Sequence, residues 1–264
     1  MTASDPLFLV LTAYLAMAVV MVGLWVLQRR IHNASIVDVG WCAGLIAVVL
    51  WYAFQATGET ERKMVAASLA VLYAGRLGLY ILFNRVIGKT EDARYRRLRE
   101  QWGTSEAVRM FGYLQLQALA LAVFSLPFLA LIRNPEPPFA LNEFVGLLIW
   151  IIAVLWEAMA DRQLAQFRSK PWNRDRVCRE GLWRYSRHPN YFFEWLHWWG
   201  YVVMGVNAPG WLMTWIGPIG MGWALLKVTG IPWAERQALE SRGAEYREYQ
   251  RTTSSFIPWF PKMK

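Results

Sequence analysis

The stretch "MTASDPLFLVLTAYLAMAVVMVGLWVLQRR", residues 1–30, decides the fold class, because its apolar part is long enough to cross a bilayer as a helix. It lacks the basic start of a signal peptide and carries Asp5 instead. Its apolar run, of about 20 residues, is also too long for a signal-peptide core. The stretch therefore predicts a first transmembrane helix rather than a cleaved leader.

The rest of the chain has the same character. Of its 264 residues, 56% are hydrophobic and 18% are charged, whereas soluble domains average about 25% charged residues. We predict an all-α fold, a polytopic membrane helix bundle of about seven transmembrane helices. The predicted spans are residues 6–28, 36–56, 64–87, 112–132, 141–163, 190–207 and 210–229.

The distribution of Lys and Arg predicts the orientation of the bundle. With the N-terminus outside, the inner segments hold 24 of these residues and the outer segments hold 3. Because cytoplasmic loops collect basic residues, we expect a cytoplasmic C-terminus, in a bacterial inner membrane. The same bias explains the net charge of +9, so nucleic acid is not an expected partner.

Three longer segments, 88–111, 164–189 and 230–264, are expected on the cytoplasmic side. Each is too short to fold alone, so we predict that they form a cap over the cytoplasmic mouth of one domain, residues 1–264. The arginines of "RYRRLREQWG" (94–103) are interpreted as a surface for anionic lipids. Two cysteines, Cys42 and Cys178, indicate neither a disulfide framework nor a metal site.

Ionisable residues inside predicted spans are candidate functional residues, since they cost several kcal/mol unless paired or hydrated. They are Asp38, Arg76, Glu157, Asp161 and Glu194. A structural ion pair is the alternative for Arg76, and an interfacial position is the alternative for Glu157. Tyr73, Arg76, Tyr80 and Asn84 recur at helical spacing, so this face is expected to meet the bundle interior rather than lipid.

A second polar face lies in "GLWRYSRHPNYFFEWLHWWG", residues 181–200. Asn190, Glu194 and His197 follow one another at helical spacing, and Pro189 suits the first turn of a helix. The preceding cations Arg184, Arg187 and His188 suit an anionic ligand near that helix terminus. Rossmann and P-loop glycine motifs are absent from the sequence, so a nucleotide would be held in another way.

These residues resemble the steroid 5α-reductase superfamily over most of residues 34–260. The tract from Gly181 resembles that family's C-terminal signature. The segment "ADRQLAQFR" resembles the family's Asp followed seven residues later by Arg, which gives Asp161 and Arg168. The segment "LYAGRLGLYILFNR" resembles the family's Tyr-rich span. The ending "EYREYQRTTSSFIPWFP" resembles its tail, and seven spans is that family's architecture. The resemblance implies an NADPH-dependent oxidoreductase that delivers hydride to the β-carbon of an apolar, steroid-like or other lipid enone.

The resemblance also implies roles for residues. Tyr73 and Asp38 would polarise the substrate carbonyl, although the family has a glutamate where this chain has Asp38, and a glutamine where it has Val37. Arg76 and Tyr80 would have substrate or structural roles. The NADPH contacts would be Asp161, Arg168, Tyr185, Arg187, His188, Asn190, Glu194, Tyr246, Tyr249 and Arg251.

Two other functions stay open. "RHPNY" and the pair Tyr246 and Tyr249 also resemble isoprenylcysteine carboxyl methyltransferases and phospholipid methyltransferases, which use S-adenosylmethionine. Seven spans, the face carrying Tyr73 and the Asp161/Arg168 spacing favour the reductase. A non-enzymatic lipid transporter or binder is the third possibility. Membrane lipids are expected partners in every case, and the sequence leaves the oligomeric state open.

Overall fold

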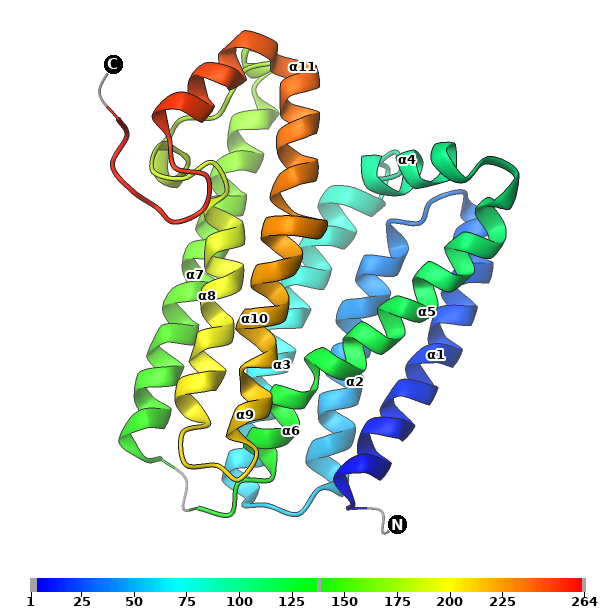
Figure 1. Ribbon diagram of the computed structural model, residues 1–264, viewed down its shortest axis with the longest axis vertical. Coiled ribbons are helices and arrows are strands. Elements are labelled where there is room, and N and C mark those ends of the chain that lie inside the picture. Colours follow the sequence, from blue (N-terminus) through cyan, green and yellow to red (C-terminus); the bar gives the residue numbers. More distant parts are fainter. Residues whose placement is uncertain (1–3, 137–138, 263–264) are drawn as a thin grey trace. The chain divides into compact units, whose positions relative to one another are not determined.

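A computed structural model describes residues 4–136 and 139–262 (Figure 1). Within these ranges every regular segment is helical, and the one β-type contact is an isolated bridge between Ser186 and Ser254. The predicted all-α fold is confirmed. The residues group into two compact units: unit 1 holds Met1–Ala140 and Gly205–Thr214, and unit 2 holds Leu141–Met204 and Trp215–Lys264.

The elements of unit 1 are α1 (Pro6–Ile31), α2 (Ile36–Gln55), α3 (Thr60–Ile81), the π-helical turn η1 (Leu82–Val86), α4 (Ala93–Trp102), the 3₁₀ turn η2 (Gly103–Ser105), α5 (Glu106–Phe124), α6 (Leu126–Ile132) and α9 (Trp211–Thr214). Helix α1 begins at Pro6 because the Asp5 carboxylate accepts a 2.9 Å hydrogen bond from the Leu7 amide. It ends at His32, whose φ of 51° lies in the left-handed region.

Helices α2 and α3 form an antiparallel hairpin with a close crossing. A Cβ atom placed on Gly78 of α3 would come within 3.0 Å of the Cys42 Cβ of α2. The absence of a side chain at Gly78 therefore lets the two helices approach, and it puts these two residues at the same level of the hairpin.

The elements of unit 2 are α7 (Leu141–Ser169), the 3₁₀ turns η3 (Pro171–Asn173) and η4 (Gly181–Arg184), α8 (Pro189–Met204), α10 (Ile216–Trp223), the π-helical turn η5 (Ala224–Val228) and α11 (Ile231–Thr252). Figure 1 shows α7 and α8 side by side along their length. Their backbones nearly touch, since a Cβ on Gly146 would lie 2.5 Å from the Gly200 carbonyl oxygen. Helix α11 bends at Gly243, where φ is 48°.

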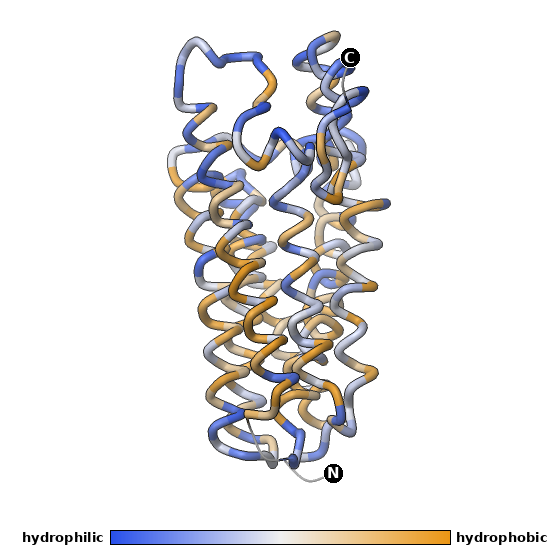
Figure 2. Tube along the Cα trace, turned by 90° about the vertical axis from the view of Figure 1, so that its left-hand side faces the viewer, coloured by the Kyte–Doolittle hydropathy of each residue, from blue (hydrophilic) through white to orange (hydrophobic). Residues whose placement is uncertain are grey.

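Five helical stretches among the described residues are long and apolar enough to cross a membrane: Pro6–Ile31, Ile36–Gln55, Thr60–Val86, Ala93–Ile132 and Leu141–Ser169. The first three match the predicted spans within a few residues, the fourth begins at Ala93 where the prediction began at 112, and the fifth extends to Ser169 where the prediction ended at 163. Figure 2 shows that hydrophobic residues predominate along the long helices. The other two predicted spans are shorter here, since α8 has 16 residues and residues 210–229 divide among α9, α10 and η5.

Candidate functional site

Asp38 lies in the first turn of α2, and both of its carboxylate oxygens are engaged within unit 1. The Tyr95 hydroxyl donates a 2.7 Å hydrogen bond to Oδ1, and Arg94 Nη2 forms a 2.7 Å ion pair with Oδ2. Gln117 Nε2 donates to the Tyr95 oxygen at 3.4 Å. The carboxylate is thus held between a cation and a buried phenol.

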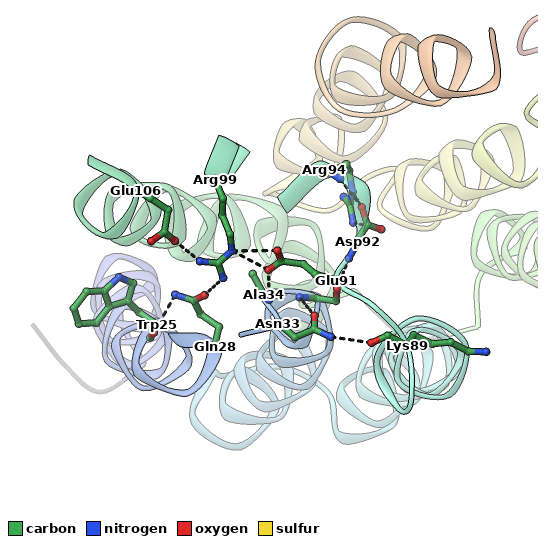
Figure 3. A network of polar contacts seen from close by, with 11 residues as sticks. Trp25, Gln28, Asn33, Ala34, Lys89, Glu91, Asp92, Arg94, Arg99 and Glu106 are labelled. Carbon is green, nitrogen blue, oxygen red and sulfur yellow. Dashed lines mark hydrogen bonds and ion pairs between the residues drawn. The ribbon is translucent and has the colours of Figure 1, made fainter. Parts of the chain in front are cut away.

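Further contacts fasten α4 and the residues just before it to the loop before α2 (Figure 3). Asp92 caps α4 by accepting from the Arg94 amide at 2.9 Å, and its own amide donates to Ser35 Oγ at 2.8 Å. The Ala34 amide donates to Glu91 Oε1 at 2.7 Å. We call Ser35, Asp38, Glu91, Asp92, Arg94, Tyr95 and Arg99 the Asp38 network.

Arg99 forms the second half of this network. Its Nε donates to both Glu91 oxygens at 3.1 Å, and its other nitrogens donate to Glu106 and to the buried Gln28. Arg94 and Arg99 are therefore paired with carboxylates of unit 1, and the predicted anionic-lipid surface of residues 94–103 stays a prediction. Burial alone would raise the pKa of the nearby Asp92 carboxyl, but the charge and hydrogen bonds of Arg94 outweigh burial and lower it.

Tyr73 is almost fully buried on α3, and Arg76 and Tyr80 are half-buried on the same helix. Asp38 precedes Cys42 by four residues and Tyr73 precedes Gly78 by five, on antiparallel helices that cross at Cys42 and Gly78. At 1.5 Å per residue, Asp38 and Tyr73 are separated by roughly 13 Å along the helix axes. They do not form a hydrogen-bonded pair, so the joint action predicted for them on one carbonyl oxygen needs correction.

Unit 2 contains a second network, centred on Arg187. The Arg187 Nε and Nη2 atoms contact Glu235 Oε1 at 2.7 and 2.6 Å. Its Nη1 donates to the backbone oxygens of Gln250 and Thr253 at 3.0 and 2.6 Å. Most of its N–H donors are therefore used within the protein. We call Arg187, His188, Glu235 and Gln250 the Arg187 network.

Glu235 receives three side-chain partners in this network. Besides Arg187, Gln250 Nε2 donates to Oε2 at 2.9 Å and His188 Nε2 lies 3.4 Å from Oε1. Burial alone would raise the pKa of Glu235, but these hydrogen bonds and the Arg187 charge lower it to about 2. Burial lowers the pKa of His188 more than Glu235 raises it, so the ring is neutral at pH 7.

The two predicted tyrosines of α11, Tyr246 and Tyr249, are buried and pack edge to face. The Tyr249 hydroxyl donates to the backbone oxygens of Trp183 and Ser186. Burial raises the pKa of both phenols, so they stay protonated. Arg251, by contrast, is 75% exposed and pairs with Glu248. The described contacts thus tie Tyr249 to the protein interior and leave Arg251 at the surface.

Helices α7 and α8 bring together a third group of predicted residues. Asn190 Nδ2 donates to Asp161 Oδ1 at 3.1 Å. Asp161 is buried, Glu194 is half-buried one turn along α8 from Asn190, and Arg168 is exposed near the end of α7. Glu157 is also buried. This group can bind a polar ligand that carries both hydrogen-bond donors and acceptors. It combines the Asn190 amide, the carboxylates of Asp161 and Glu194, and the Arg168 cation.

Most cofactor residues predicted from the sequence lie at the start of α8, on α11, and in the part of α7 that packs on α8. Tyr185 precedes α8 and packs against Phe260 at 6.0 Å. The sequence did not mark Glu235, which lies among many charges in a polar helix. Sequence reasoning did not select Tyr95 either, although a single aromatic residue within a run of arginines indicates that its ring is buried.

Comparisons with known proteins identify a family for this chain but no function. The family described as "Protein of unknown function (DUF1295)" matches residues 24–253. An uncharacterised protein of Schizosaccharomyces pombe is 24% identical over 269 residues, which cover 89% of this chain and 75% of the relative. No solved structure matches the chain.

Proposed function

This chain belongs to the DUF1295 family, and because that family is described as of unknown function, we propose an activity from the chain's own residues. The protein is an NADPH-dependent membrane reductase that saturates a C=C bond conjugated to a carbonyl group in an apolar, lipid-like substrate. The proposal extends the resemblance to steroid 5α-reductases.

The observation that carries the proposal is the hydrogen bond between Asn190 and Asp161. The resemblance marks both as cofactor residues from positions 29 apart in the chain, and the α7–α8 packing brings them into contact. Beside them, the Glu194 carboxylate is half-buried. An amide next to carboxylates complements the carboxamide of a nicotinamide, which both donates and accepts hydrogen bonds.

The residues of unit 2 fit such a cofactor, with one reassignment. We place the carboxamide near Asn190, Asp161 and Glu194, and the phosphates near the exposed Arg168 and Arg184. Arg187 contributes indirectly, because its donors already bind Glu235 and backbone oxygens. We therefore propose that it positions the segment leading into α8, rather than gripping a phosphate.

When bound, NADPH would supply the hydride that reduces the β-carbon of the enone. The C=C electrons would move toward the carbonyl oxygen, and the α-carbon would take up a proton from water. The Tyr73 hydroxyl would donate a hydrogen bond to that oxygen and stabilise the developing enolate. Asp38, which is bound by Arg94 and Tyr95, would act as a fixed negative charge elsewhere in unit 1 rather than on the same oxygen.

The proposed topology keeps seven crossings, with α8 and the α9–α10–η5 stretch as the sixth and seventh. The N-terminus lies outside, and α4, residues 170–188 and α11 lie on the cytoplasmic side of a bacterial inner membrane. The Lys and Arg distribution supports this orientation. NADPH is a cytoplasmic molecule, so its binding residues belong on that side.

A thermal-shift comparison of cofactors tests the proposal. In detergent, saturating NADPH should raise the unfolding temperature, because a ligand that binds only the folded state stabilises it. The variant Asn190→Ala should lose most of that shift. Asn142→Ala is the matched control, since Asn142 also donates a hydrogen bond from its amide to α8 (Val203 O, 3.3 Å). A shift with S-adenosylmethionine alone would instead establish the methyltransferase.

The variant Tyr73→Phe separates binding from chemistry. It removes only the phenol oxygen, so NADPH should still shift the unfolding temperature while enone reduction falls by 10²-fold or more, as for the loss of an oxyanion donor. Turnover equal to that of the unaltered protein would remove Tyr73 from the mechanism. Stabilisation by neither cofactor would favour a lipid transporter or binder.

A further inference from the structure

We propose that the segment Phe256–Phe260 is a fixed membrane-interface anchor that inserts its side chains among anionic phospholipid headgroups; we call it the tail anchor. This inference rests on the proposed topology, in which α8 is the sixth crossing, and is independent of the reductase chemistry. Three of its five side chains are large, apolar and exposed: Ile257 at 58%, Trp259 at 70% and Phe260 at 76%. Adjacent exposed apolar residues of this size mark a contact surface.

The exposure of these side chains does not come from a loose chain end. The Trp259 amide donates to the Tyr185 oxygen at 2.9 Å, and the Lys262 amide donates to the Thr252 oxygen at 2.8 Å. Just before the anchor, the Arg187 amide donates to the Ser254 oxygen at 2.8 Å. Hydrogen bonds on both sides therefore hold the backbone in place while the side chains point outward.

The position of the tail anchor along α8 matches a bilayer boundary. Phe256 packs on Phe192 and Trp195, each with ring centroids 5.7 Å apart, and these rings lie in the first two turns of α8. The apolar part of α8 begins at Pro189. A segment packed beside that beginning lies where a membrane helix enters the lipid, the depth at which Trp is enriched.

The charge near the anchor favours an anionic surface. Residues 252–264 contain two Lys and no Asp or Glu. Aromatic side chains flanked by basic ones are the combination that binds the anionic interface of a membrane.

The test uses the full-length protein in nanodiscs. A single cysteine is introduced as Phe260→Cys, labelled with an environment-sensitive fluorophore, and quenched by lipids with nitroxide groups near the headgroup. The native Cys42 and Cys178 are buried, so they should label slowly. The control is Arg251→Cys, which is 75% exposed in the same unit but has no exposed aromatic neighbour in sequence.

We expect lipid quenching at position 260 to exceed that at position 251 at least threefold in phosphatidylglycerol discs. Lys262→Glu should reduce the excess, and neutral phosphatidylcholine discs should give less quenching. Ile257→Cys provides a second label site should the first variant fail to purify as a single species. Equal quenching at 260 and 251 would overturn the proposal, as would shielding of position 260 by a second copy or a soluble partner.

Discussion

The two arginine-centred networks differ in how deeply their cations are buried. In the Asp38 network, the Arg94 side chain is 35% exposed and has two carboxylate partners, Asp38 and Asp92. In the Arg187 network, the arginine is 10% exposed and has one carboxylate partner, Glu235, plus backbone oxygens. Removing one side of a buried pair strands the other charge, whereas water takes over at an exposed pair. The Arg187 network should therefore matter more for stability.

The largest expected effect is that of Arg187→Gln. The change should cost about 3–5 kcal/mol, because Glu235 is left partly buried without its cation and two backbone oxygens lose their donor. The unfolding temperature in detergent should fall on the order of 10 °C. Arg251→Gln, the matched control, should change it very little, since that pair is solvent-exposed. Equal losses from the two variants would refute the difference drawn between buried and exposed pairs.

Acid should weaken unit 2 before unit 1. Glu235 has a pKa of about 2 in the folded state against a usual 4.5, which corresponds to roughly 3 kcal/mol of stability present above pH 4.5 and lost as pH falls toward 2. His188, whose pKa is lowered by burial, stays neutral when the unfolded chain takes up a proton below about pH 6.5. Stability of unit 2 should therefore start to fall at that pH.

Unit 1 should respond later, because the pKa of Asp92 is lowered from a usual 3.8 and its contribution is lost only below that pH. Hydrogen exchange measured at pH 7.5, 6 and 5, corrected for intrinsic rates, should show opening in peptides from α11 but not from α4. His188→Gln should flatten the response of α11. Opening of both helices at the same pH would contradict the comparison.

Arg94→Gln should have an intermediate effect of about 1–2 kcal/mol, since the arginine is partly exposed and the remaining carboxylates can be hydrated. Its matched control is Arg96→Gln, on the exposed side of α4. The difference in unfolding temperature between these two variants measures the contribution of the Asp38 contact. If Arg94→Gln lowered the free energy of unfolding as much as Arg187→Gln does, burial of the arginine would not explain the difference in stability expected between the two networks.

The smallest effect is expected for Arg176→Gln. Arg176 is 66% exposed, and its 3.4 Å contact with Glu245 is a surface ion pair. Its removal should cost less than about 0.5 kcal/mol, which is within the usual range for such pairs. Its unfolding temperature should match that of the unaltered protein within about 2 °C, and a larger drop would indicate a second role for this residue.

Sequence reasoning succeeded where the relevant signal was local. Five of the seven predicted spans lie in long apolar helices, since a helix needs about 20 apolar residues to cross a bilayer and such a run can be read directly from the sequence. Helical spacing placed Tyr73, Arg76 and Tyr80 on one helix, and Pro189 marked the start of α8. A resemblance then suggested which residues to inspect.

The partners of those residues were decided only by tertiary structure. Asp38 pairs with Arg94, 56 residues away in the sequence, and Arg187 pairs with Glu235, 48 residues away. Other arginines, such as Arg96 and Arg251, also lie in polar, charge-rich segments, so the local sequence does not distinguish them from the paired ones. The positions of Asp38 and Tyr73 along the helix axes follow from the point where α2 and α3 cross, at Gly78. Periodicity is a property of one helix, but ion pairing depends on which helices pack together and at what height. The sequence alone therefore determined where the long helices lie, and the packing of the helices determined which charged residues form ion pairs.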